Sequence, residues 1–145
     1  MAKKDDESKR GRWLVKTEPS CYSYTDLERD GKTVWDGVTN NLALKHIRAI
    51  KKGDSVLVYH TGDEKAVAGL AEAVSDAYPD PSQNDVKLAV VDIRPRRAAP
   101  RPLQLAEIKN LAEMAGSPLV RMPRLSVMPI SDGEWKKLTE LTGLS

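Results

Sequence analysis

The stretch Lys52-Gly53-Asp54-Ser55-Val56-Leu57-Val58-Tyr59 decides the fold class of this chain. Its first three residues have the composition of a tight turn. Apolar residues begin directly after the turn, and Val56, Leu57 and Val58 form a run of the length of one strand. The stretch therefore predicts a turn followed by a β-strand over 55–59.

Helices and further strands are expected on both sides of this strand. Towards the N-terminus, apolar spacing predicts a strand at 13–16 and a helix at 24–29 that Ser23 can cap. It also predicts a helix that starts after Asn40 or Asn41, with Leu42, Ala43, Ile47 and Ile50 on one face. Towards the C-terminus, it predicts strands at 66–77 and 86–93, a helix at 103–114, extended pieces at 119–120 and 125–128, and a final helix beginning at Ser131. Strands with interspersed short helices and no regular βαβ period favour an α+β fold. We expect a small, curved, mostly antiparallel sheet or open barrel surrounded by short helices.

The composition is that of a soluble globular domain. Of the 145 residues, 40% are hydrophobic and 30% are charged, and a chain of this length can bury a real core. There is no apolar run long enough for a transmembrane helix, and the charged start lacks the apolar segment of a secretory signal. We expect a disordered tail at 1–10 and a single domain at 11–145. The expected protein is intracellular and monomeric, in the cytoplasm of a bacterium or the nucleus of a eukaryote.

Metal ligands and nucleophiles are scarce in this chain. Cys21 is the only cysteine, and His46 and His60 are the only histidines. Neither histidine has a cysteine pair or a carboxylate cluster nearby in the sequence, and the glycine-rich nucleotide-binding motifs are missing. We therefore expect no metal site and no cofactor. A nucleophilic pair of Cys21 with either histidine stays open, because such residues need only be close in space.

Positive charge is unevenly distributed, although the net charge of +2 is too small to indicate nucleic-acid binding by itself. The arginines gather in the C-terminal half, at Arg94, Arg96, Arg97, Arg101, Arg121 and Arg124. Pro95, Pro100 and Pro102 are expected to fix an extended, exposed path through the first four arginines. Such a path suits a solvated loop as well as a phosphate-binding surface.

The turn Trp35-Asp36-Gly37-Val38-Thr39-Asn40 has the parts of a site for a planar polar ring. It places an indole beside a carboxylate, a hydroxyl and a carboxamide, which offers a face for stacking and short groups that read a ring edge. The same residues are also compatible with a core tryptophan followed by an ordinary Asp-Gly turn. From these residues alone, both interpretations stay open.

Three other segments put polar residues at the end of an apolar strand or turn, where proteins often expose functional groups. They are Lys16-Thr17-Glu18-Pro19-Ser20, Tyr59-His60-Thr61 and Arg124-Leu125-Ser126-Val127. Each has an ordinary structural explanation by itself. If the segments meet at one rim of a small barrel, they line one pocket together with the 35–40 turn.

Taken together, these motifs resemble the EVE domain family, a PUA-like group related to the YTH domains that read modified RNA bases. The resemblance rests on 13–19, 35–40, 52–54 with 59–61, 71–74 with 78–81, 91–93 and 124–129. It runs from about Arg12 to the C-terminus. It implies a PUA-like fold and a pocket for a nucleobase that carries a small modification, such as a methyl or hydroxymethyl group.

The resemblance also implies roles for individual residues. Trp35 would be a stacking wall and Tyr59 a second wall, while Asp36 would order the turn or accept from an exocyclic amine. The other expected pocket residues are Thr17, Ser20, Val38, Asn40 and Ser126. The rim, which would meet phosphate or sugar, is expected to comprise Lys16, Thr39, His60, Arg94, Arg96, Arg97 and Arg124. Family members often have arginine where this chain has Thr39, so a charged contact at the pocket mouth is in question.

The expected function is non-catalytic binding of a modified nucleobase in DNA or RNA. One alternative is an enzyme that acts on a base or nucleotide, with His60 or Cys21 as the nucleophile or proton carrier. The other is a protein-interaction module with a vestigial pocket. Binding is favoured because the sequence offers no convincing machinery to transform a base.

Overall fold

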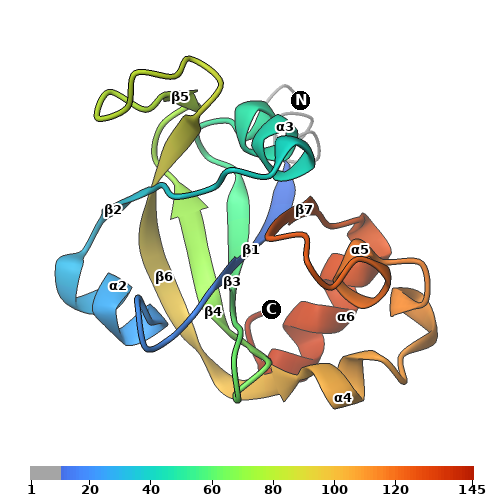
Figure 1. The fold of residues 1–145 in the computed structure, drawn as a ribbon. Helices are drawn as coiled ribbons and strands as arrows, with labels where there is room; N and C mark the ends of the chain where they lie inside the picture. The colour runs from blue at the N-terminus through green and yellow to red at the C-terminus, as the bar shows by residue number, and fades with distance from the viewer. Residues whose placement is uncertain (1–10) are drawn as a thin grey trace, which may run out of the picture.

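A computed structural model describes residues 11–145 (Figure 1), and the expected tail at 1–10 lies outside these residues. The described residues form a curved, seven-stranded sheet with short helices around it. The strands are β1 (Arg12–Thr17), β2 (Thr33–Trp35), β3 (Ser55–His60), β4 (Ala66–Ala73), β5 (Tyr78–Pro79), β6 (Ala89–Gln104) and β7 (Val127–Pro129). The helices are α2 (Tyr24–Asp30), α3 (Asn41–Ala49), α4 (Leu105–Ile108), α5 (Pro118–Arg121) and α6 (Asp132–Thr142). The predicted α+β class is confirmed.

The strand order is β2-β6-β4-β3-β1-β7, with β5 pairing beside it on β6. All pairings are antiparallel except β1 with β3, which run parallel with Trp13 opposite Val56. The expectation of a mostly antiparallel curved sheet therefore holds, with one parallel pair at its centre. β7 comes from the far end of the chain and pairs with β1, so the two ends of the domain are joined in one sheet.

Gly69 is where α2 packs onto the sheet. The register of β4 against β6 shifts between Val67 and Gly69, as expected from a glycine within a strand. A Cβ atom at position 69 would lie 2.5 Å from the ring of Tyr24, which is the first residue of α2. The absent side chain thus lets the Tyr24 ring lie against the strand, where its hydroxyl accepts a hydrogen bond from the Arg97 amide at 3.0 Å.

The capping signals in the sequence are confirmed at two helices. Ser23 and Asp26 form a capping box at the start of α2, and Ser131 and Glu134 form one at the start of α6. The predicted buried face of α3 is wrong at one position. Leu44 is buried there, whereas Leu42 is 37% exposed, because the apolar stripe follows 43, 44, 47 and 50.

The arginine-rich path is extended and exposed, as expected, but it belongs to a strand of the sheet and not to a solvated loop. β6 begins at Ala89, later than predicted, and continues through Gln104. Val86, the expected first strand residue, is 86% exposed. The register against β4 shifts between Leu70 and Ala71, next to Pro95, so the prolines occupy an irregular part of the ladder.

The region after β6 also differs from the prediction. Because β6 continues to residue 104, helical structure starts later than expected, and the expected helix at 103–114 consists of α4 and a separate 3₁₀ turn at Ala112–Met114. The piece at 119–120 is helical, since Ser117 caps α5 and Pro118 occupies its first turn. Among the described residues, every helix is too short or too polar to span a bilayer.

Candidate functional site

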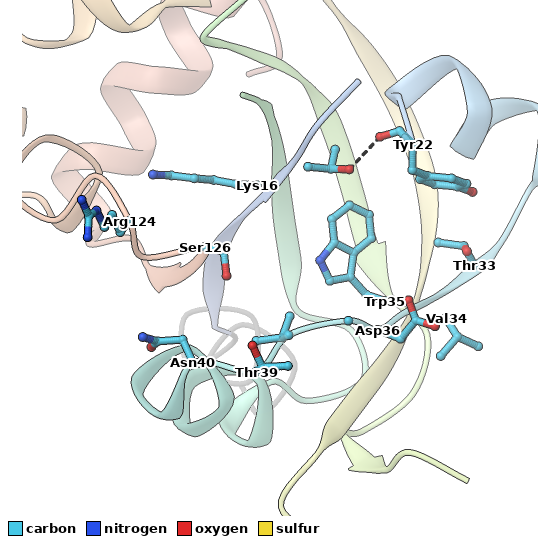
Figure 2. Close-up of a pocket in the computed structure, with 13 residues that line it drawn as sticks. Lys16, Tyr22, Thr33, Val34, Trp35, Asp36, Thr39, Asn40, Arg124 and Ser126 are labelled. Carbon is cyan, nitrogen blue, oxygen red and sulfur yellow. Dashed lines mark hydrogen bonds between the residues drawn. The ribbon is translucent and has the colours of Figure 1, made fainter. Parts of the chain in front are cut away.

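A cavity of about 450 Å³ opens between β1, β2 and the loop that leads from β2 into α3 (Figure 2). Three segments distant in the sequence line it: Lys16, Thr17 and Tyr22 from the first, 33–40 from the second, and Arg124 and Ser126 from the third. The third segment reaches the cavity because the Lys16 amide donates a hydrogen bond to the Ser126 carbonyl at 2.9 Å. Three of the four segments singled out from the sequence, at 16–17, 35–40 and 124–126, therefore meet at this cavity, whereas 59–61 does not line it.

Trp35 is both a core residue and a wall of the cavity. It is 7% exposed, and β2 holds it opposite Val91 of β6. The ring of Tyr22 stands edge-on to the indole, with the ring centroids 6.4 Å apart and the planes at 81°. In Figure 2 the indole nitrogen lies on the ring edge that faces Lys16 and Ser126.

The indole N–H of Trp35 is open to the cavity. Within residues 11–145, no buried side-chain nitrogen or oxygen lacks a hydrogen-bond partner. By contrast, the indole N–H of Trp13 donates to a carboxylate oxygen of Asp54 at 2.9 Å, and the described contacts give the Trp35 N–H no such acceptor. It is therefore a solvent-accessible donor that a ligand in the cavity can use.

The loop after Trp35 is shaped by Gly37 and Asn40. Gly37 has φ of 77°, in the left-handed region that favours glycine. Asn40 ends the loop as the N-cap of α3, and its side-chain oxygen accepts from the Ala43 amide at 3.0 Å. The carboxamide oxygen is thus engaged by the helix, which leaves the NH₂ group for the cavity.

Lys16 supplies a positive charge at one wall. Its ammonium donates to the Pro123 carbonyl at 2.9 Å and lies 5.6 Å from the centre of the Tyr59 ring. Burial lowers the pKa of Lys16 from its usual value. Arg124 is a second cation at the cavity, and Asp36 is the only carboxylate among its lining residues. The cavity therefore has an excess of positive charge.

The structure brings together nine of the fifteen residues singled out from the sequence. They are Lys16, Thr17, Trp35, Asp36, Val38, Thr39, Asn40, Arg124 and Ser126. Thr17 has a structural task as well, because its hydroxyl donates to the Tyr22 carbonyl at 2.7 Å (Figure 2). That bond fixes the segment that carries the Tyr22 ring.

Tyr59 and Ser20 do not line the cavity. Tyr59 is 3% exposed and belongs to the core beneath Lys16. Ser20 is at the surface, where its hydroxyl donates to the Glu18 carboxylate at 3.0 Å. The second aromatic residue beside the cavity is Tyr22, which the sequence analysis did not select.

His60 is a buried structural residue. Its Nε2 accepts a hydrogen bond from the Tyr24 amide at 2.9 Å, and its Nδ1 lies 2.8 Å from the Glu64 carboxylate. The bond from an amide N–H requires an unprotonated Nε2, so the proton is on Nδ1. With both ring nitrogens engaged, His60 fits neither the expected contact with phosphate nor a nucleophilic pair with Cys21.

Arg94, Arg96 and Arg97 lie on β6 and do not line the cavity. Glu72 on the neighbouring strand forms ion pairs with Arg94 at 2.8 Å and with Arg96 at 3.1 Å. Because the Glu72 carboxylate offsets part of the charge of Arg94 and Arg96, these two side chains are weaker candidates for phosphate contacts than Arg124.

Four lining residues were missed: Tyr22, Thr33, Val34 and Gly37. A period-two signal could have found Thr33, since Thr33 and Trp35 lie on the same face of a strand. Tyr22 has no such local signal, because its position depends on the bond between Thr17 and its carbonyl. Within the described range, no group of three His, Cys, Asp or Glu side chains could hold a metal ion.

The EVE domain family model matches residues 11–141. The chain belongs to the EVE domain family. Human thymocyte nuclear protein 1 is 32% identical to this EVE domain over 157 residues, which cover 85% of the chain and 70% of the human protein. A crystal structure of a protein from Agrobacterium tumefaciens has a TM-score of 0.89 and 32% identity, covering 92% of this chain and 94% of the other.

A crystal structure of human THYN1 in complex with DNA that contains 5-methylcytosine is also similar to this EVE domain. Its TM-score is 0.84 and its identity 29%, with 91% of this chain and 97% of the human chain covered. The expected PUA-like fold is therefore confirmed.

Proposed function

We propose that this EVE domain binds DNA without catalysis and reads a modified base, such as 5-methylcytosine, in the cavity beside Trp35. One observation carries the proposal: a largely buried indole forms the wall of an open cavity and turns its free N–H into it. The cavity of about 450 Å³ has the size of a small-molecule site. The similarity to THYN1, which was crystallised with DNA containing 5-methylcytosine, supports this choice of ligand.

The lining suits a flat polar ring that bears a methyl group. Trp35 and Tyr22 offer aromatic surface, and Val38 offers aliphatic surface for the methyl group. The hydroxyl of Ser126 and the NH₂ group of Asn40 can hydrogen-bond the edge of the base. A single methyl group in an apolar pocket contributes roughly 1–3 kcal/mol, so we expect discrimination of about tenfold or more.

Access to the base determines which form of DNA binds best. Stacking on an aromatic side chain contributes roughly 1–3 kcal/mol, and extracting a base from a duplex costs a few kcal/mol. The two terms nearly cancel in duplex DNA, so phosphate contacts must supply the rest. Lys16 and Arg124 are placed to make them. A single-stranded or mispaired target should therefore bind more tightly than a fully paired one.

The experiment is a titration of the protein, followed by tryptophan fluorescence, with oligonucleotides of one sequence. The set carries cytosine, 5-methylcytosine, 5-hydroxymethylcytosine or N6-methyladenine at one position, as single strands, as duplexes and as RNA. We expect one modified base to bind at least about tenfold more tightly than its unmodified counterpart. Equal affinities across the set would overturn the proposal.

Two further measurements separate the proposal from its alternatives. Mass spectrometry of the oligonucleotides after prolonged incubation should show no change in mass, whereas a change would indicate an enzyme. Val86→Ser is the control for a surface substitution outside the cavity, because it alters an exposed apolar side chain that does not line the cavity. This variant should bind like the unaltered protein. If no oligonucleotide binds, a protein-interaction module becomes the better explanation.

A further inference from the structure

A second cavity, of about 500 Å³, adjoins the cavity beside Trp35. Asn40 and Arg124 line both. Figure 2 places these two residues on the same side of the first cavity, with Ser126 near them. The other residues that line the second cavity are Leu42, Arg121, Met122, Pro123 and Leu125.

The wall between the two cavities is held by bonds within the fold. The Lys16 ammonium, at the first cavity, donates to the carbonyl of Pro123, at the second, at 2.9 Å. Asn40 is fixed by its capping bond to α3. The two cavities thus keep a constant separation, and a ligand that fills both must have two parts joined by a short link.

Two of the apolar side chains that line the second cavity are exposed to solvent. Leu42 is 37% exposed and Met122 is 43% exposed. Only two other large apolar residues in the described range are as exposed, Val34 and Val86, and Val34 lines the first cavity. Exposed apolar surface beside a ligand cavity favours a ligand with an apolar face.

The charge of the second cavity favours a ligand that is also anionic. Arg121 and Arg124 line it, and it has no carboxylate. Arg121 reaches only a backbone carbonyl, that of Ala115 at 3.4 Å. Arg124 makes no ion pair with any described residue. A nucleotide combines the two properties, because its base has an apolar face and its phosphate is negative.

We propose that the second cavity seats the nucleotide that adjoins the modified one in the same strand. Its base stacks on Leu42 and Met122, and the phosphate between the two nucleotides lies at Arg124, which borders both cavities. This inference rests on the proposed function of the first cavity. It extends recognition from one base to a dinucleotide and makes the neighbouring position part of the affinity.

The test compares single-stranded DNA with the modified base and an intact neighbour against the same DNA with an abasic neighbour, on either side in turn. One of the abasic strands should bind the unaltered protein about fivefold or more weakly, because the apolar contacts of the missing base with Leu42 and Met122 are lost. The double variant Leu42→Ser, Met122→Ser should bind the intact strand with a similar loss. It should show no further loss with the abasic strand, while Val86→Ser behaves like the unaltered protein.

Two failures can be told apart. If neither abasic neighbour weakens binding and the modified base is still discriminated, the second cavity does not seat a nucleotide and the proposed function stands. If the modified base is not discriminated with an intact neighbour, both proposals fail. Because the abasic comparison uses the unaltered protein, it decides the matter even if the double variant does not fold.

Discussion

The side-chain oxygen of Asn40 accepts a hydrogen bond from the Ala43 amide at 3.0 Å, so one residue both begins α3 and borders two cavities. The two tasks use different atoms, and they can be separated by substitution. Asn40→Ser keeps an oxygen that can cap the helix and removes the NH₂ donor. We expect its free energy of unfolding in urea to stay within a few tenths of a kcal/mol and its affinity for modified DNA to fall. Unchanged affinity would show that the NH₂ group makes no bond to the base.

Asn40→Ala removes both functions and serves as the comparison. Loss of the cap should lower the free energy of unfolding by about 1 kcal/mol. Binding measured well below the unfolding transition should then match that of Asn40→Ser. A much weaker Asn40→Ala variant would indicate that helix α3 itself positions the ligand.

Trp35 needs a more conservative change than alanine. Because it is 7% exposed in the core, Trp35→Ala should destabilise the protein by about 3–5 kcal/mol, and lost binding would then have two causes. Trp35→Phe keeps an aromatic face and removes only the N–H and part of the ring. We expect a folded protein, by circular dichroism, whose affinity for modified DNA is reduced. Equal affinity would exclude the indole N–H as a donor to the base.

Arg124 and the arginines of β6 should respond differently to salt. Arg124 makes no ion pair within the described structure, so Arg124→Gln should weaken binding and reduce the slope of log affinity against log salt by about 1. Arg94→Gln, Arg96→Gln is the matched control, because Glu72 already pairs with both. The control should keep the slope of the unaltered protein. The reverse result would place the DNA backbone along β6.

His60 should be important for stability and not for binding. Replacing it with alanine leaves the buried Tyr24 amide without its acceptor, which costs about 1–3 kcal/mol. We expect denaturant unfolding to shift accordingly, while the affinity for DNA of the folded protein stays constant. A loss of affinity with normal stability would instead support the contact with phosphate that the sequence suggested. Nitrogen chemical shifts of the ring should show the proton on Nδ1.

The hydrogen bond from the Tyr78 hydroxyl to the Asp92 carboxylate raises the pKa of Tyr78 from 10.0 to about 12. Since the folded-state pKa is the higher one, the bond contributes its full stability below about pH 10 and loses it as the pH rises towards 12. The free energy of unfolding of Tyr78→Phe should therefore fall less between about pH 10 and pH 12 than that of the unaltered protein. Absorbance at 295 nm should show one tyrosine fewer ionising near pH 12. An unchanged titration curve would contradict the assignment.

The accuracy of sequence reasoning depended on whether a signal was local. The helix caps at Ser23 and Ser131 bond to residues three positions on, and both capping residues were predicted correctly. The extent of β6 was not, because its pairing with β4 overrides what Pro95 and Pro100 suggest locally. The prediction that Leu42 is buried was wrong for a related reason, since only the position of α3 on the sheet decides which apolar residues face the core.

Predictions for the candidate site also succeeded where the signal was local and failed where it depended on contacts distant in the sequence. Trp35 and Asn40 were selected because their turn has a recognisable composition, and Lys16 and Ser126 because they lie where polar residues follow an apolar strand or turn; all four line the cavity. His60 was assigned to the rim through the family resemblance, but its partner Tyr24 is 36 residues away in the sequence. No local pattern carries the information that such a residue is buried and satisfied.

The joining of β1 to β7 has a consequence for how the cavity beside Trp35 forms during folding. Lys16, Trp35 and Ser126 contribute to one cavity although the chain between them forms most of the sheet. No fragment shorter than nearly the whole domain contains all the walls, so a nascent chain has no partial binding site. Under the proposed function, ligand binding and global unfolding are coupled, and DNA should protect the slowest-exchanging amides of the sheet as well as those of the loops.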